Sequence, residues 1–316
     1  MLRVMVAAVL PSVLAAACGG GGGSTLTIYT SVTQDTVESV VAGFSEVEPG
    51  VEVVVFRAPT GELAARIAAE LASGDLGADV LWLTEPLSMY RYREQGLLQV
   101  WQPAGADALP PELVEDAFWG TRRMHMVVVT GSSPPVEVTT WDDVRNPDLR
   151  VVIPDPGLAG SALAVLGYVA LTPGLGMDFY RDLAANGAGQ ASAPGDVVTA
   201  VAEGRFDAGI TLEQPARVAA AAGSPLRIAW PSPGAITFGS PIAVVDGAGT
   251  AAEAFVEYAL SEGGQTRIAA TGWFPARRGV GGPELPPGAD EVFPDWESLS
   301  GQESGLLDEY RSIFDG

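Results

Sequence analysis

The sequence is poor in the residues that most enzyme centres need. Among its 316 residues there is one cysteine, Cys18, one histidine, His125, and no lysine, so that every basic side chain is an arginine. One cysteine forms no intramolecular disulfide. One histidine argues against a Ser-His-Asp triad, a Cys-His pair and a multi-histidine metal site. No nucleophile elbow is present either. We therefore expect a protein that is not an enzyme. Acid–base chemistry by isolated carboxylates stays as the alternative.

Positive charge is also scarce. The chain has 17 basic residues against 39 acidic ones, a formal net charge of −22. A chain this acidic is repelled by nucleic acids at long range, so DNA and RNA are excluded as partners. Beyond the N-terminus, no apolar stretch approaches the ~20 residues that a membrane-spanning helix needs.

The N-terminus has the pattern of an export signal. A basic residue, Arg3, precedes a short apolar stretch, and small residues lead to Cys18. This run resembles a bacterial lipoprotein signal, in which the cysteine becomes the lipidated N-terminus; Ala15 stands where that family usually has leucine. The alternative is an ordinary signal peptide with an incidental cysteine. We predict a signal peptide over residues 1–17 and a flexible Gly/Ser-rich leash over residues 18–25.

The remainder alternates between strand and helix patterns. Leu26–Tyr29 and Val51–Arg57 are apolar runs typical of buried strands, and between them apolar residues recur at helical spacing. The same alternation continues along the chain. It predicts an α/β fold with a mostly parallel sheet.

Four stretches together carry a family resemblance. They are Leu26–Ser31, Thr60–Ile67 with Ala78–Trp82, Pro154–Gly157 with Gly160–Ala162, and Ala254–Ser261 with Gly264-Gln265. In this order and spacing they resemble the extracellular solute-binding proteins of ABC importers, in the group that includes ferric-iron and 2-aminoethylphosphonate binders.

The resemblance implies a two-lobed, periplasmic-binding-protein-like fold, with a hinge and an interlobe cleft. Lobe one is expected to combine residues 26–126 with 240–278, lobe two to contain residues 127–239, and residues 279–316 to form a loop and a C-terminal helix that packs on either lobe. It also implies a monomer without cofactor that gives a small solute to a permease and its ATPase; a sensor that keeps the fold but feeds no permease is the alternative. Such a protein is held at the extracellular face of the membrane, or in the periplasm, through Cys18.

Ligands of such folds bind beyond the carboxyl ends of the strands. The loops and helix starts at these ends supply the predicted ligand-binding residues: Thr30, Ser31, Thr60, Gly61, Glu85, Gly160, Ser161, Ala162, Thr211 and Glu213. Three of these loops lead into helix N-termini, which favour an anion. The alternative is that the hydroxyl residues among them only cap helices.

Two ligand classes remain open. Helix N-termini together with Glu85 or Glu213 suit a zwitterion of the aminophosphonate type. In the iron alternative, the same two glutamates would be metal ligands. Against iron, the stretch Thr211–Pro215 lacks the adjacent tyrosines of the iron binders, and Thr33 stands near the place of their early histidine.

Overall fold

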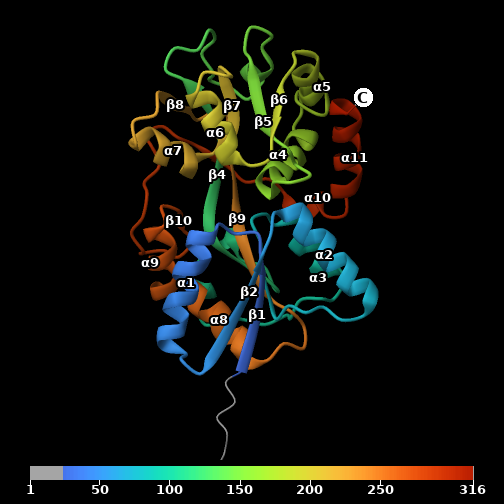
Figure 1. Cartoon of the computed structure of the whole chain (residues 1–316), viewed down its shortest axis with the longest axis vertical. Helices are drawn as coiled ribbons and strands as arrows, with labels where there is room; N and C mark the ends of the chain where they lie inside the picture. Colours follow the sequence, from blue (N-terminus) through green and yellow to red (C-terminus); the bar gives the residue numbers. More distant parts are fainter. Residues whose placement is uncertain (1–23, 316) are drawn as a thin grey trace, which may run out of the picture.

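The computed structural model describes residues 24–315, which form two halves stacked along the long axis of the molecule (Figure 1). The strands are β1 (Ser24–Thr30), β2 (Val51–Arg57), β3 (Val80–Trp82), β4 (Trp119–Gly131), β5 (Val151–Pro154), β6 (Gly189–Ala191), β7 (Ala208–Leu212), β8 (Leu226–Ala229), β9 (Ala235–Val244), β10 (Phe274–Pro275) and β11 (Glu291–Val292). The helices are α1 (Gln34–Val47), α2 (Thr60–Ser73), α3 (Leu87–Glu94), α4 (Gly160–Leu171), α5 (Asp178–Ala185), α6 (Pro194–Ala202), α7 (Glu213–Ala221), α8 (Thr250–Leu260), α9 (Glu262–Ala270), α10 (Trp296–Leu299) and α11 (Glu303–Phe314).

Two long strands connect the halves. The main strand order is β2-β1-β3-β9-β4-β7-β5-β6, and β4 and β9 pass through the middle of the molecule (Figure 1). These two strands run in opposite directions, so β9 pairs antiparallel with β3 and β4, and β4 pairs antiparallel with β7 and β8. The expectation of a mostly parallel sheet is therefore wrong at its centre. It is right at the two ends, where β1 pairs parallel with β2 and β3, and β5 with β6 and β7.

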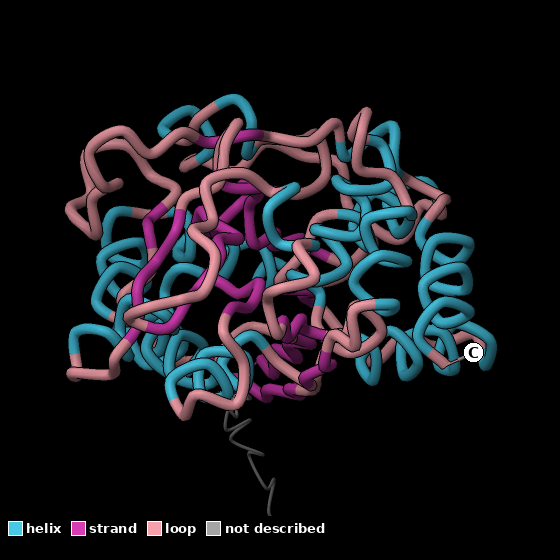
Figure 2. Tube along the Cα trace, turned by 90° about the horizontal axis from the view of Figure 1, so that it is seen from above, coloured by secondary structure: helices cyan, strands magenta, loops and turns pink. Residues whose placement is uncertain are grey.

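Helices enclose the strands in each half. Seen from above, the strands lie inside a surround of helices and loops (Figure 2). Inner strands covered on both faces are apolar along their length, as in β3 and β5, whose residues are all buried. In α1 the buried residues Val37, Val40 and Phe44 follow helical spacing. The two-lobed α/β fold follows from this packing.

Three of the predicted segment boundaries fall inside strands of the structure. Strand β1 begins at Ser24, so the last two residues of the predicted leash belong to the sheet. The predicted lobe boundaries, 126/127 and 239/240, fall inside β4 and β9. The predicted signal peptide and Cys18 lie outside the described residues.

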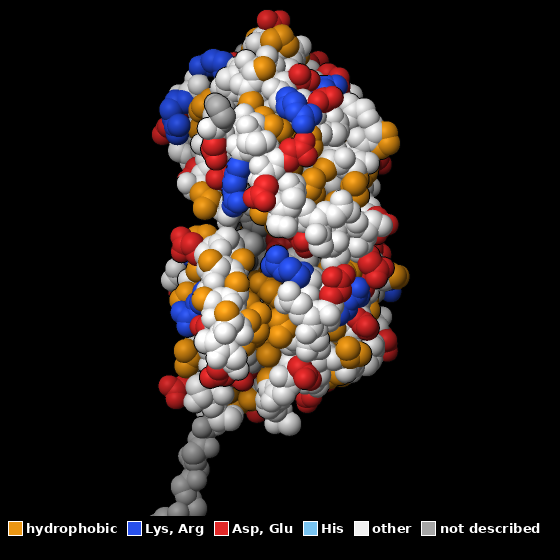
Figure 3. Space-filling view, turned by 90° about the vertical axis from the view of Figure 1, so that its right-hand side faces the viewer, with side chains coloured by type: hydrophobic (Ala, Val, Ile, Leu, Met, Phe, Trp, Pro, Cys, Tyr) orange, Lys and Arg blue, Asp and Glu red, His pale blue; other side chains and the backbone are white. Residues whose placement is uncertain are grey.

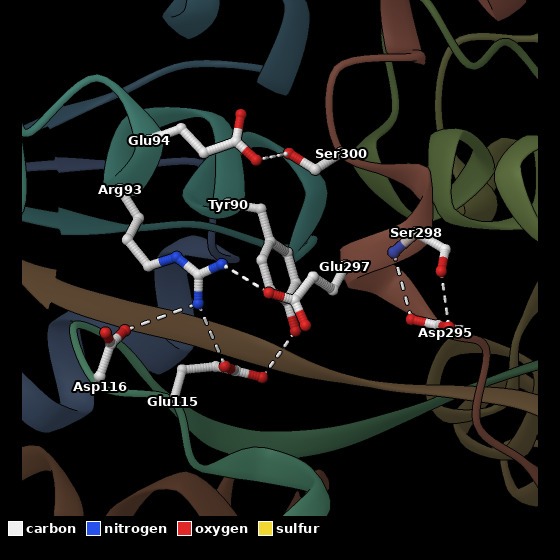
Figure 4. Close-up of polar contacts among 9 residues, drawn as sticks. All are labelled: Tyr90, Arg93, Glu94, Glu115, Asp116, Asp295, Glu297, Ser298 and Ser300. Atoms are coloured by element: carbon white, nitrogen blue, oxygen red, sulfur yellow. Dashed lines mark hydrogen bonds and ion pairs between the residues drawn. The ribbon is translucent and has the colours of Figure 1, made fainter.

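The C-terminal segment contacts both halves. Helix α11 packs on α4 and α5 of the upper half, where the Tyr310 ring meets Tyr180 edge-on at 5.2 Å. Around α10, Glu297 pairs with Arg93 of α3 at 3.2 Å, and Ser300 donates a hydrogen bond to Glu94 (Figure 4). The sequence left open which lobe the C-terminal helix packs on, and in the structure this helix, α11, packs on the second half.

The beginning of the same segment is anchored beside the crossing strands. Strand β11 adds to β9, and Glu291 contacts Arg123 and His125 of β4. His125 is buried, with the ring of Phe274 edge-on at 4.6 Å. This histidine therefore has a structural environment.

Candidate functional site: the junction of the two halves

Three hydroxyl side chains meet where strands of the lower half end. Ser31 follows β1, Thr84 follows β3, and Thr60 begins α2 after β2. Thr84 Oγ1 lies 3.2 Å from Ser31 Oγ and 3.1 Å from Thr60 Oγ1, and the Thr84 N–H donates to Ser31 Oγ at 3.1 Å. Because these strands are parallel, their carboxyl ends bring the three side chains to one edge. We call Ser31, Thr60 and Thr84 the hydroxyl cluster.

The start of α4, in the upper half, faces this cluster. A Cβ atom added to Gly160 would lie 2.7 Å from Glu85 Cγ, 2.7 Å from Thr84 Oγ1 and 2.8 Å from Thr60 Oγ1. A Cβ atom on Gly61 would overlap the carbonyl oxygen of Gly157. Only glycine permits approaches this close. The two halves are therefore closed on each other here, and Figure 3 shows the notch along their boundary on one side of the molecule.

Glu85 lies beneath Gly160 and is fully buried. Its carboxylate accepts a hydrogen bond from the backbone N–H of Ser88 at 3.1 Å. Burial raises the pKa of Glu85 above its ordinary value, and the charge of Glu303 at the start of α11 adds to the rise. The junction thus contains an acidic group whose charged form is poorly solvated.

The capping alternative is not supported by the helix starts. The residues preceding α1, α2 and α4 are Thr33, Pro59 and Ala159, and none of them makes a side-chain capping hydrogen bond. Thr60, Ser161 and Ala162 lie inside the first turns instead. In α1 the Thr36 N–H donates to the carboxylate of Asp35 at 2.8 Å, so the first backbone N–H groups of α2 and α4 are the ones that can serve an anion.

Three predicted residues lie apart from the cluster. The hydroxyl of Thr30 donates to the carbonyl of Trp82 at 2.7 Å. The hydroxyl of Thr211 donates to the carbonyl of Pro194 at 2.8 Å. Glu213 accepts from Arg217 Nε at 2.6 Å, while its Oε2 atom is buried without a hydrogen-bond partner. Successive side chains along a strand point to opposite faces, which explains why the side chain of Thr30 points away from the cluster that Ser31 joins.

Glu213 nevertheless lies where the halves touch. Gln214 and Arg217, from the first turns of α7, donate to the carbonyl oxygens of Thr271 and Gly272, between α9 and β10. The next residue, Trp273, packs its ring 4.1 Å from the guanidinium carbon of Arg122 in β4. Sequence reasoning missed Thr84 and Arg122. The position of Thr84, directly after a buried strand, was an available signal for it.

Comparison with known proteins identifies the family. A family model of bacterial extracellular solute-binding proteins matches residues 26–274. The chain belongs to this family, whose members are binding proteins of ABC-importer type and not enzymes. Among curated proteins, none matches this sequence.

Solved structures share the fold. The periplasmic binding protein AfuA from Actinobacillus pleuropneumoniae, with exogenous fructose-6-phosphate bound, has a TM-score of 0.82 and 19% identity, covering 92% of this chain and 99% of that one. Iron-bound HitA from Pseudomonas aeruginosa has a TM-score of 0.77 and 21% identity, with the same coverage. The substrate-binding protein of an ABC transporter from Agrobacterium tumefaciens has a TM-score of 0.79 and 18% identity, covering 94% and 96%. Because the sequence identities are this low, the similarity establishes the shared fold and not a shared ligand.

The family is extracellular or periplasmic, and its members deliver small solutes to a permease. Within residues 24–315, no helix has the length and apolar character needed to cross a bilayer. The fold and the family thus give the general function, and the ligand has to be argued from the junction itself.

Proposed function

We propose that this protein is the receptor of an ABC importer for a small anionic or zwitterionic solute, of the aminophosphonate type. The observation that carries the proposal is the hydroxyl cluster facing the start of α4 across the junction. Hydroxyl groups and uncapped helix N-termini donate hydrogen bonds to phosphonate, phosphate or carboxylate oxygens. Glu85 or Glu213 would accept the ammonium group of a zwitterion.

The closed arrangement of the two halves supports binding of a solute enclosed between them. Gly160 and Gly61 let the halves approach until their backbones nearly touch the opposite residues. A solute held between them is removed from water, where its charge interacts more strongly with fixed donors. The solute would then be released when the hinge opens at the permease.

A ferric-iron receptor is the second candidate, because iron-bound HitA shares the fold. Iron prefers several carboxylate or phenolate oxygens, and within residues 24–315 no group of three or more His, Cys, Asp or Glu side chains could hold a metal. Of the two glutamates available, Glu213 is paired with Arg217. We therefore favour the organic anion or zwitterion.

Thermal shift of the metal-free protein tests the proposal. A ligand that binds only the folded state raises the Tm with its occupancy. We expect a rise with 2-aminoethylphosphonate or phosphate that is lost in Thr84→Val and kept in Thr199→Val, a matched change at an exposed position of α6. A rise with ferric salts alone, accompanied by a visible charge-transfer band, would overturn the choice of ligand.

Anchoring through a lipid on Cys18 and a monomeric state belong to the same proposal. Mass spectrometry of the membrane-extracted protein should show cleavage before Cys18 and added acyl mass. Replacement by Cys18→Ser should release the chain into the medium as a monomer in light scattering. A soluble, unmodified wild-type chain would contradict the anchor.

A further inference from the structure

Arg122 is a buried cation that forms no ion pair with any residue of the described range 24–315. It lies in β4 where the two halves meet and has no exposed surface. Its Nη1 atom donates to Thr36 Oγ1 at 3.4 Å, and its Nε atom has no hydrogen-bond partner. The only described carboxylate whose charge raises its pKa is that of Asp35, an exposed residue of α1. A buried charge without a paired partner is costly to the folded protein.

The surroundings of Arg122 are built to donate hydrogen bonds. Its guanidinium stacks on Trp273, and the indole Nε1 of Trp273 is likewise buried without an acceptor. Thr36, whose hydroxyl Arg122 contacts, belongs to the first turn of α1, and its backbone N–H already donates to the carboxylate of Asp35 at 2.8 Å. A guanidinium donor and an indole donor therefore come together with no acceptor among the described residues for the two orphaned atoms.

Burial lowers the pKa of Arg122 to about 9, so the side chain stays charged at neutral pH in the free protein. An anion at this place would supply the missing negative charge and accept from Nε. A planar guanidinium is suited to two-point contact with a carboxylate, phosphate or phosphonate.

We propose that Arg122, with Trp273 and the first turn of α1, is the subsite that binds the anionic group of the transported solute. This inference rests on the proposed function. The neighbouring basic residue, Arg123, is excluded from the subsite because it pairs with Glu291 at 3.3 Å.

The proposal predicts opposite effects on stability and binding. Arg122→Met removes the unpaired charge and keeps an apolar stem over Trp273, so the free protein should gain Tm. The same change should remove the anion-dependent rise in Tm and weaken binding by about 30-fold or more, as for truncation of one partner of a buried charge pair. A purely structural arginine would instead give a lower Tm with binding retained.

The experiment uses the full chain carrying Cys18→Ser, with Tm and calorimetric Kd measured for acetate, inorganic phosphate and 2-aminoethylphosphonate. Arg123→Gln is the control: it loses the contact with Glu291 but should keep the anion response. If Arg122→Met does not fold, Arg122→Lys decides, because it keeps the charge and loses the planar fork, and its affinity should fall.

Retained anion affinity in either Arg122 variant would overturn the subsite. Glucose and putrescine are measured alongside as neutral and cationic probes. A wild-type response to one of these two alone would also overturn the subsite, while the protein would still be a solute receptor. Loss of the anion response in Arg122→Met, with a gain in Tm, supports it.

Discussion

Gly160→Ala is the substitution that isolates closure of the two halves. The added methyl group would lie 2.7 Å from both Glu85 Cγ and Thr84 Oγ1, atoms of the opposite half. Gly160 is not a positive-φ glycine, so alanine suits its backbone conformation. The helix preference for alanine, at most about 1 kcal/mol, is the same in the open and closed states. It therefore cancels in the closure equilibrium.

The closed state alone suffers the overlap. Inserting a methyl group into a packed contact costs about 1–3 kcal/mol. If binding requires closure, this corresponds to a roughly 5- to 150-fold loss of affinity. The Tm of the free protein should not fall, since the clash vanishes when the halves separate and alanine is preferred to glycine in a helix.

The assay combines calorimetric Kd with distances between spin labels. Replacing Cys18 removes the native cysteine, so labels can be placed at Ala72→Cys in α2 and Ala185→Cys in α5, both exposed. With saturating solute, Gly160→Ala should retain a long-distance population that the unsubstituted protein loses. Gly195→Ala is the matched control, since it lies at the start of α6 and its Cβ would meet nothing within 4 Å. Wild-type affinity and full closure in Gly160→Ala would refute the reasoning.

Three further predictions follow from the same contacts. Burial raises the pKa of Glu85 in the folded protein, so the stability that Glu85 contributes is present below its ordinary pKa of about 4.5 and is lost as the pH rises through the higher folded value. Glu85→Gln should therefore raise the Tm at pH 7 but not at pH 4. Equal gains in Tm at both pH values would contradict this. Arg93→Gln should lower the unfolding free energy by about 1 kcal/mol at low salt and by less at 1 M salt, because Arg93 bridges exposed carboxylates including Glu297. If chemical denaturation gives the same loss of unfolding free energy at both salt concentrations, this explanation is wrong. In hydrogen exchange, the amides around Leu87 should be protected with or without solute, and those around Gly160 should be protected only with it. An equal gain in protection at both places on adding solute would contradict the prediction.

The meeting of strand ends could be predicted from the sequence. Ser31, Thr60 and Glu85 each follow an apolar strand of one parallel set, so topology alone brings them to one edge, and Gly160 opens a helix after a strand of the other half. The hydrogen bonds that individual side chains make within their own half could not be predicted from the order of strands and helices. The hydroxyl of Thr30 turns to a backbone carbonyl of the neighbouring strand.

The crossing strands were harder to predict. The apolar pattern indicates a strand only from Met124, whereas β4 begins at Trp119 and includes Arg122 and Arg123. Two adjacent arginines look like a solvated turn in a sequence, yet Arg122 is buried because Trp273 and α1 cover it. Strand β11 has two residues within a proline-rich stretch, and only its pairing with β9 defines it.

The chemistry of the contacts between the halves indicates where the molecule pivots. At one place Leu87 of α3 and Leu299 of α10 both lie against Gly167 of α4, and the two leucines are almost completely buried. Water cannot replace these apolar contacts without a cost of roughly 25 cal/mol per Å² exposed. At the other place Gly160 faces the hydroxyl of Thr84, a group that water solvates readily. Opening is therefore easier on the side of the hydroxyl cluster. The leucine contact lies beside the place where Trp296 of α10 packs on Phe238 of β9, with ring centroids 5.9 Å apart, and it is where the halves should stay together.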